Sequence, residues 1–218
     1  MLRRAAAVLL DIQDYELKAG IRSQEDPALG TVTGQVFLSD TLENGAGYAT
    51  HLGNPAAMQE LLEMIAQPTP REFHDRLAAH SHADACDTSC PDCLRSYSNL
   101  AYHNLLDWRL AVDMAELALD PSIPLLLSSP RWSRVADLAA VTLEAARPGF
   151  SRTLFGGLPA LTDGTEAVIV THPLWLTERA TVGPELAAAW DDAERSHGLR
   201  VDPQRSFISV FEALRRPV

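Results

Sequence analysis

The feature that most constrains this chain is a run of three cysteines within eight residues. Cys86, Cys90 and Cys93 stand at spacings of four and three, and Asp, Thr, Ser and Pro separate them. Such polar residues do not form an apolar core segment, and an odd cluster of thiols in a chain without an export signal does not build a disulfide framework. The run is typical of a tight turn that directs several sulfurs toward one metal ion.

Zinc is the metal that this run predicts, because thiolates are soft ligands and tetrahedral Zn²⁺ accepts three cysteines and one histidine. A structural site is expected rather than a catalytic one, since no His-Glu-x-x-His motif occurs. The fourth ligand must come from elsewhere. His80 and His82 precede the run, His103 follows it, and Asp84 is a poorer option because a carboxylate is a harder ligand. Spacing alone leaves these candidates open, although His82 would share a helix face with Cys86.

Charge and lysine content exclude several classes of protein. Eighteen basic and twenty-nine acidic residues give a net charge of −11, so any contact with nucleic acid must be local. Lys18 is the single lysine and follows Leu17, which excludes the Gly-Lys-Ser/Thr end of a P-loop and hence a self-sufficient P-loop ATPase. No apolar run reaches the roughly 18 residues of a membrane span, so no membrane partner is expected and a cytoplasmic location is predicted.

The hydrophobic pattern predicts a mixed α+β fold, in which a helical zinc-knuckle module over 1–120 is joined to a small α/β half over 121–218. Pro121 and Pro124 mark the boundary because neither can continue the preceding helix. A further helix should begin with Thr69 as its N-cap. Other helices are expected over 2–10, 55–66, 100–119, 133–147 and 185–197, strands over 15–22, 35–38, 125–127, 152–155 and 167–171, and a final element over 207–214.

Two segments also carry a family likeness: SDTLENGAGY at 39–48, and the run from Cys86 through Cys90, Cys93 and His103 to Asp107. Together they resemble the C-terminal zinc-binding (MZB) domain, a former domain of unknown function, of MrfA-type DEAD/DEAH-box helicases. The likeness covers about residues 35–119. It implies structural zinc held by Cys86, Cys90, Cys93 and His103, with His82 as the alternative to His103.

The resemblance further implies a non-catalytic accessory domain of a superfamily 2 DNA helicase, in DNA repair or in DISARM-type phage defence. Its partner would be a helicase core or a parental helicase chain, with DNA contacted indirectly or locally. The chain has no Walker A motif and no DEAD/DEAH box, so no enzymatic activity of its own is expected.

Three alternatives remain open. The chain could be an independent zinc hydrolase, a degenerate nuclease using Glu16 and Lys18, or a redox sensor that oxidises Cys90 and Cys93. The glycine-bearing loop at 44–47 could approach a phosphate, but a tight strand-to-helix connection, with Asp40 as a capping carboxylate, is the favoured interpretation. Arg95, Arg109, Arg131 and Arg134 suit phosphate contacts, yet in an acidic chain we expect carboxylates as their partners.

Overall fold

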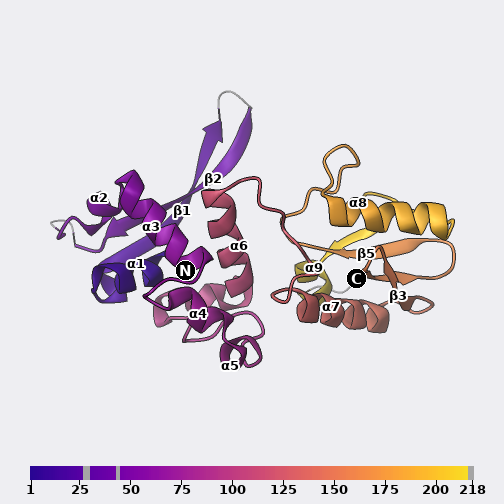
Figure 1. The fold of residues 1–218 in the computed structure, drawn as a ribbon, viewed down its shortest axis with the longest axis horizontal. Coiled ribbons are helices and arrows are strands. Elements are labelled where there is room, and N and C mark those ends of the chain that lie inside the picture. Colours follow the sequence, from indigo (N-terminus) through magenta and orange to yellow (C-terminus); the bar gives the residue numbers. More distant parts are fainter. Residues whose placement is uncertain (27–29, 43–44, 216–218) are drawn as a thin grey trace. The chain divides into compact units, whose positions relative to one another are not determined.

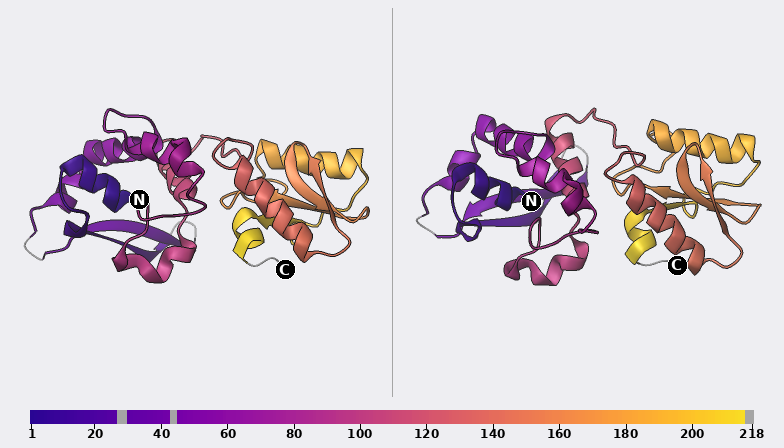
Figure 2. Two further views of the ribbon diagram at one scale, coloured as in Figure 1. Left: turned by 90° about the horizontal axis from the view of Figure 1, so that it is seen from below. Right: turned by 60° about the horizontal axis from the view of Figure 1, so that its bottom comes forward.

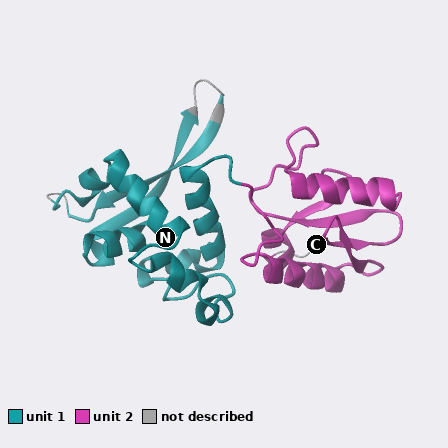
Figure 3. Ribbon diagram, in the orientation of Figure 1, with its two compact units in different colours: residues 1–123 teal, residues 124–218 magenta. Residues whose placement is uncertain are grey.

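The computed structural model of the protein describes residues 1–26, 30–42 and 45–215. The chain divides into two compact units, Met1–Ile123 and Pro124–Val218 (Figure 3). The division falls inside the proline-containing segment 121–124, for which the sequence suggested a boundary after Asp120. Each unit combines helices with a small sheet, so the expected mixed α+β class is confirmed. Among the described residues, no helix combines the length and apolarity that crossing a membrane requires.

Unit 1 is built from helices around a two-stranded sheet (Figure 1). The strands β1 (Leu17–Asp26) and β2 (Thr31–Asp40) form an antiparallel hairpin in which Ile21 lies opposite Val36. The helical elements are α1 (Leu2–Leu10), η1 (Asp14–Glu16), α2 (Tyr48–Leu52), α3 (Pro55–Ala66), α4 (Phe73–Ala78), α5 (His80–Ala83), η2 (Tyr97–Leu105) and α6 (Trp108–Leu119).

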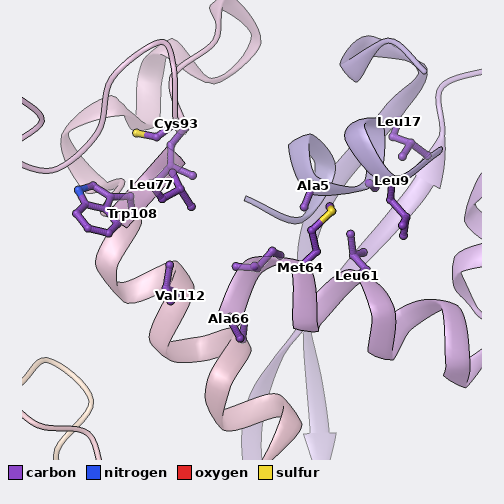
Figure 4. Close-up of a cluster of buried hydrophobic side chains, with 14 of the residues drawn as sticks. Ala5, Leu9, Leu17, Leu61, Met64, Ala66, Leu77, Cys93, Trp108 and Val112 are labelled. Atoms are coloured by element: carbon purple, nitrogen blue, oxygen red, sulfur yellow. The ribbon is translucent and has the colours of Figure 1, made fainter. Parts of the chain in front are cut away.

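The core of unit 1 lies where α1, α3 and α6 pack together (Figure 4). Leu61 and Met64 of α3 and Val112 of α6 are almost fully buried in it. Apolar residues at helical spacing bring one stripe of each helix inward, and burying such side chains contributes about 1.5–3 kcal/mol each. Cys93 and Trp108 belong to the same cluster, so the cysteine run is attached directly to the core.

Two helix boundaries of unit 1 differ from expectation. The long helix expected over 100–119 is divided, because the Asp107 carboxylate accepts hydrogen bonds from the N–H groups of Arg109 and Leu110 and starts α6 there. The helix expected to start from Thr69 begins only after Glu72, which adopts the left-handed conformation with φ of 55°. A residue in that conformation cannot lie inside a right-handed helix, so the chain turns before α4.

Unit 2 contains a four-stranded sheet of order β3 (Ser151–Phe155), β4 (Leu158–Thr162), β5 (Ala167–Thr171) and β6 (Phe207–Ser209). The first three strands are antiparallel and β6 runs parallel to β5. Helices α7 (Ser133–Ala146) and α9 (Val210–Arg215) cover one face (Figure 1), and α8 (Pro184–Asp191), which continues into the π-turn η3 (Asp192–Ser196), covers the other. Coverage on both faces explains why every residue of β5 is buried.

The predictions for unit 2 were wrong at two places. Residues 125–127 form no strand, because their backbone bonds to side chains instead: Leu127 N–H donates to Glu185 Oε2, and Leu125 O accepts from the Trp175 indole. Strand β4 was not predicted. It follows the tight turn at Gly156 and Gly157, which have φ of 52° and 86° and permit a hairpin that few other residues could form.

Candidate metal centre

Four side chains of unit 1 converge on one point. The ligand atoms of His82, Cys86, Cys90 and Cys93 all lie within 4.8 Å of one another. Cys86 Sγ is 3.7 Å from Cys93 Sγ, and His82 Nε2 is 3.5 Å from Cys90 Sγ. Cys86 and Cys93 are buried, whereas Cys90 and His82 are half-buried. Among the described residues, this is the group of histidine, cysteine and carboxylate side chains that could hold a metal ion.

Local hydrogen bonds bring these residues together. Cys86 N–H donates to His82 O at 2.8 Å, so one helical turn aligns their side chains. The carbonyl of Cys90 accepts from the N–H groups of Cys93, Leu94 and Arg95, which closes a tight turn after Pro91. The N–H of Cys90 in turn donates to Cys93 Sγ at 3.0 Å. An N–H donor of this kind favours a thiolate, the form that binds metals.

The ring of His82 is held with one nitrogen free to bind. Nδ1 lies 2.9 Å from the carbonyl oxygen of Leu77. A carbonyl only accepts, so Nδ1 must carry the proton and the lone pair of Nε2 faces Cys90. The ring also packs edge-on against Trp108, with ring centres 5.3 Å apart. A histidine that donates its second nitrogen to a carbonyl is the arrangement found around bound metals.

The first turn of α6 holds the cysteine run from its other side. The Trp108 backbone N–H donates to Thr88 O at 2.9 Å, and the Trp108 indole donates to Cys86 O at 3.4 Å. The buried guanidinium of Arg109 donates to Asp87 O at 2.5 Å. Arg109 therefore supports the turn from inside the protein and is not placed for the phosphate contacts considered from the sequence.

Burial governs the protonation of the thiols when no metal is bound. Burial raises the pKa of the Cys86 thiol far above its ordinary value, and the neighbouring Cys93 raises it further. Burial likewise raises the pKa of Cys93, although the Cys90 N–H acts in the opposite direction. These thiols are neutral without a cation. A metal ion favours the deprotonated form because it binds the thiolates directly. Metal binding must therefore release protons from the thiols.

The structure places His82, and not His103, with the three sulfurs. His103 Nε2 lies 2.9 Å from Asn99 Oδ1 and 3.0 Å from Ser96 O. Because both oxygens accept, Nε2 carries a proton and is engaged away from the sulfurs. The preference for His103 is corrected accordingly. The four-residue spacing from His82 to Cys86 is one helical turn, and it is the sequence signal for the proximity of these two side chains.

Within the described residues, the other motifs noted in the sequence form no comparable group of metal-binding side chains. Glu43 and Asn44 lie outside the described residues. The N-terminus of α2 is filled by the protein itself, because the Asp40 carboxylate accepts from the N–H groups of Gly47 and Ala49 at 3.0 and 2.9 Å. This carboxylate occupies the position that a phosphate would need. The capping interpretation of the loop is the one that the structure supports.

An open cleft of about 1120 Å³ borders the four-residue group. Arg4, Asp14, Arg76, His82 and Cys90 are among the residues that line it. The cleft gives an ion a route from solvent to the half-buried side of the group, a requirement for any real metal site.

Neither a family model nor a solved structure matches the chain. The chain is 29% identical over 115 residues to Druantia protein DruE of Escherichia coli (strain UMEA 4076-1). The matched segment is 53% of this chain but 6% of DruE, so this chain corresponds to a small part of that protein.

Proposed function

We propose that the chain is a zinc-binding, non-catalytic accessory domain of a superfamily 2 helicase system that acts in phage defence. The observation that carries the proposal is the group of His82 and three cysteines, in which each ligand is oriented by neighbouring backbone. The proposal replaces His103 with His82 in the ligand set inferred from the family resemblance.

Two of the distances between ligand atoms match a tetrahedral zinc site, and all the ligand atoms lie within 4.8 Å of one another. With Zn–S bonds of about 2.3 Å and a Zn–N bond of about 2.05 Å, a tetrahedral site separates two sulfurs by about 3.8 Å and a sulfur from a nitrogen by about 3.6 Å. The structure has 3.7 Å between Cys86 Sγ and Cys93 Sγ, and 3.5 Å between Cys90 Sγ and His82 Nε2. The donor set of three sulfurs and one imidazole nitrogen is also one that zinc prefers.

Four protein ligands complete a tetrahedron, which supports a structural role and leaves no position for a water or a substrate. A zinc hydrolase would need such an open position. The redox alternative accounts for the cysteines but gives no role to His82, whose ring is held by Leu77 O and Trp108 with Nε2 toward Cys90. A structural zinc gives all four side chains a role.

The helicase part of the proposal rests on the similarity to DruE, which belongs to a phage-defence helicase system. Because the matched segment is a small fraction of DruE, helicase chemistry would lie in other parts of such a protein or in a partner. The absence of a P-loop lysine from this chain agrees with that division of labour. The similarity favours phage defence over DNA repair as the setting.

Metal analysis tests the first half of the proposal. Purified protein should contain one zinc per chain, and cobalt-substituted protein should show sulfur-to-cobalt charge transfer and the visible bands of a tetrahedral ion. Cys86→Ser should lose both signals. An octahedral cobalt spectrum, or no metal after purification without chelator, would contradict a closed Cys₃His site.

Co-purification tests the second half. The zinc-loaded chain, immobilised, should retain the helicase core encoded with it, and the metal-free Cys86→Ser variant should retain much less. The chain alone should hydrolyse no ATP. Equal retention by both forms would separate helicase binding from the metal site, and no retention by either would refute the helicase association while leaving the zinc assignment intact.

A further inference from the structure

The segment η2 (Tyr97–Leu105) lies on the outside of unit 1 (Figure 2), and none of its residues is buried. Tyr97 is 95% exposed and Tyr102 is 59% exposed. The two leucines of the same segment, Leu100 and Leu105, are also exposed. Large apolar side chains gathered on one short segment mark an interaction surface, whereas single exposed residues do not.

The exposure of this segment is not the result of a loose backbone. Ser96 N–H donates to Asn99 Oδ1 at 2.8 Å, and the Asn99 amide donates to Leu94 O at 2.9 Å. His103 Nε2 donates to Asn99 Oδ1 at 2.9 Å. These bonds fix the backbone before and after Tyr97. The exposed phenol ring is therefore held on an ordered turn.

Two guanidinium groups donate to this turn, and Arg95, whose own guanidinium donates to Ser89 Oγ at 3.0 Å, lies two residues before Tyr97. Arg3 Nη1 donates to Ser98 Oγ at 3.1 Å, next to Tyr97, and Arg4 Nη2 donates to the carbonyl of Arg95 at 2.7 Å. Among the described residues, Asp14 is the carboxylate that pairs with one of them, at 3.1 Å from Arg3. Three arginines therefore flank this turn in a chain whose net charge is −11.

We propose that the η2 segment and the three flanking guanidiniums form a binding surface for single-stranded nucleic acid. Exposed aromatic rings beside arginines are how proteins bind single strands without reading their sequence, since every base has a face that can stack. A guanidinium has five N–H donors. Arg4 uses one for the carbonyl of Arg95, and Arg95 uses one for Ser89 Oγ, which leaves donors for phosphates.

The features of the surface favour this ligand over a duplex or a protein. Bases in a duplex are already stacked and offer no face to Tyr97, so a duplex would use the arginines alone. Arginines beside exposed tyrosines combine the contacts that phosphates and unpaired bases need, which favours a single strand over a protein partner. The proposal goes beyond the accessory role and holds whether or not the chain associates with a helicase.

Fluorescence anisotropy with the zinc-loaded full chain tests the proposal. The probe is a fluorescein-labelled oligothymidine of about 20 nucleotides, longer than the roughly 4–16 nucleotides that a small domain covers. Tyr97→Ala should weaken binding about tenfold, the effect of losing one stacked base, and Tyr97→Phe should bind as the wild type does. Phe37→Ala, which removes a 42% exposed ring from β2, is the matched control and should leave binding unchanged.

Salt titration separates the stacking from the phosphate contacts. Arg95→Gln should reduce the slope of log K against log salt by about 0.7, whereas Tyr97→Ala should lower K without changing the slope. Oligouridine in place of oligothymidine shows whether RNA or DNA binds better, and binding of either supports the surface.

Three outcomes would overturn the proposal. They are absence of binding at low salt, equal binding of duplex and single strand without any effect of Tyr97→Ala, and dependence of helicase retention, but not of oligonucleotide binding, on Tyr97. The last result would show that the surface is a protein interface.

Discussion

Replacing His82 and His103 in turn distinguishes the site found in the structure from the one that the family resemblance suggested. In the structure, His82 Nε2 lies 3.5 Å from Cys90 Sγ, and His103 is engaged with Ser96 and Asn99. His82→Ala therefore removes one of the four proposed metal ligands. His103→Ala removes hydrogen bonds that fix the η2 turn and leaves the ligands in place.

The two substitutions should differ by orders of magnitude. A structural zinc site contributes about 10–16 kcal/mol at neutral pH, so an even division over four ligands gives about 2.5–4 kcal/mol for His82. Since about 1.4 kcal/mol is a factor of ten, zinc affinity should fall about 10²–10³-fold in His82→Ala. His103→Ala loses neutral hydrogen bonds of about 0.5–1.5 kcal/mol each and should keep the wild-type zinc affinity.

Competition with a chromophoric chelator measures the affinity, and elemental analysis after dialysis measures the retained metal. Wild type and His103→Ala should each retain one zinc per chain under conditions that strip His82→Ala. Circular dichroism of the zinc-saturated variants checks that both are folded. The reasoning is refuted if His103→Ala loses zinc while His82→Ala binds it as tightly as the wild type.

Three further predictions concern the fold. Arg109→Leu removes the cation 3.7 Å from the buried carboxylate that caps α6 and should reduce the free energy of unfolding in urea by about 3–5 kcal/mol; an unchanged midpoint would contradict this. Gly156→Ala should lower the melting temperature more than Gly164→Ala does, because both positions have positive φ but an added Cβ at Gly156 would lie 2.6 Å from the backbone of α8. Backbone N–H groups, first that of Glu166, hold the pKa of the exposed Asp163 carboxyl below its ordinary 3.8. That stabilisation is present above pH 3.8 and is lost as pH falls through the lowered pKa, so Asp163→Asn should flatten the acid limb of a stability-against-pH curve.

The sequence predicted that the three cysteines lie together, but not which histidine lies beside them in the structure. Three thiols within eight residues can reach one point because the chain between them is too short to separate them. Whether His103 lies beside the sulfurs depends on where the backbone turns after Cys93. There the side chain of Asn99 bonds back to Leu94 and Ser96 and takes His103 into its own network, and such side-chain bonds leave no periodic pattern.

Helices with a clear apolar stripe were predicted closely, as for Leu2–Leu10 and Pro55–Ala66. Errors arose where one residue decides the conformation. Asp107 ends one helical segment and begins another inside a continuous amphipathic pattern, and Glu72 interrupts a helix by adopting positive φ. The backbone of residues 125–127 finds its partners in Glu185 and Trp175, which are distant in sequence.

The hydrogen bonds between α6 and the cysteine run have a consequence for how unit 1 unfolds. Cys93, Trp108 and Val112 belong to the same buried cluster as Met64 of α3 (Figure 4), so no apolar boundary separates the ligands from the core. A region connected in this way opens as one cooperative unit. Loss of the metal would then weaken the protection of amide hydrogens along α3 and α6 as well as in the turn. The ion would therefore stabilise the whole core of unit 1, and not only the turn that binds it.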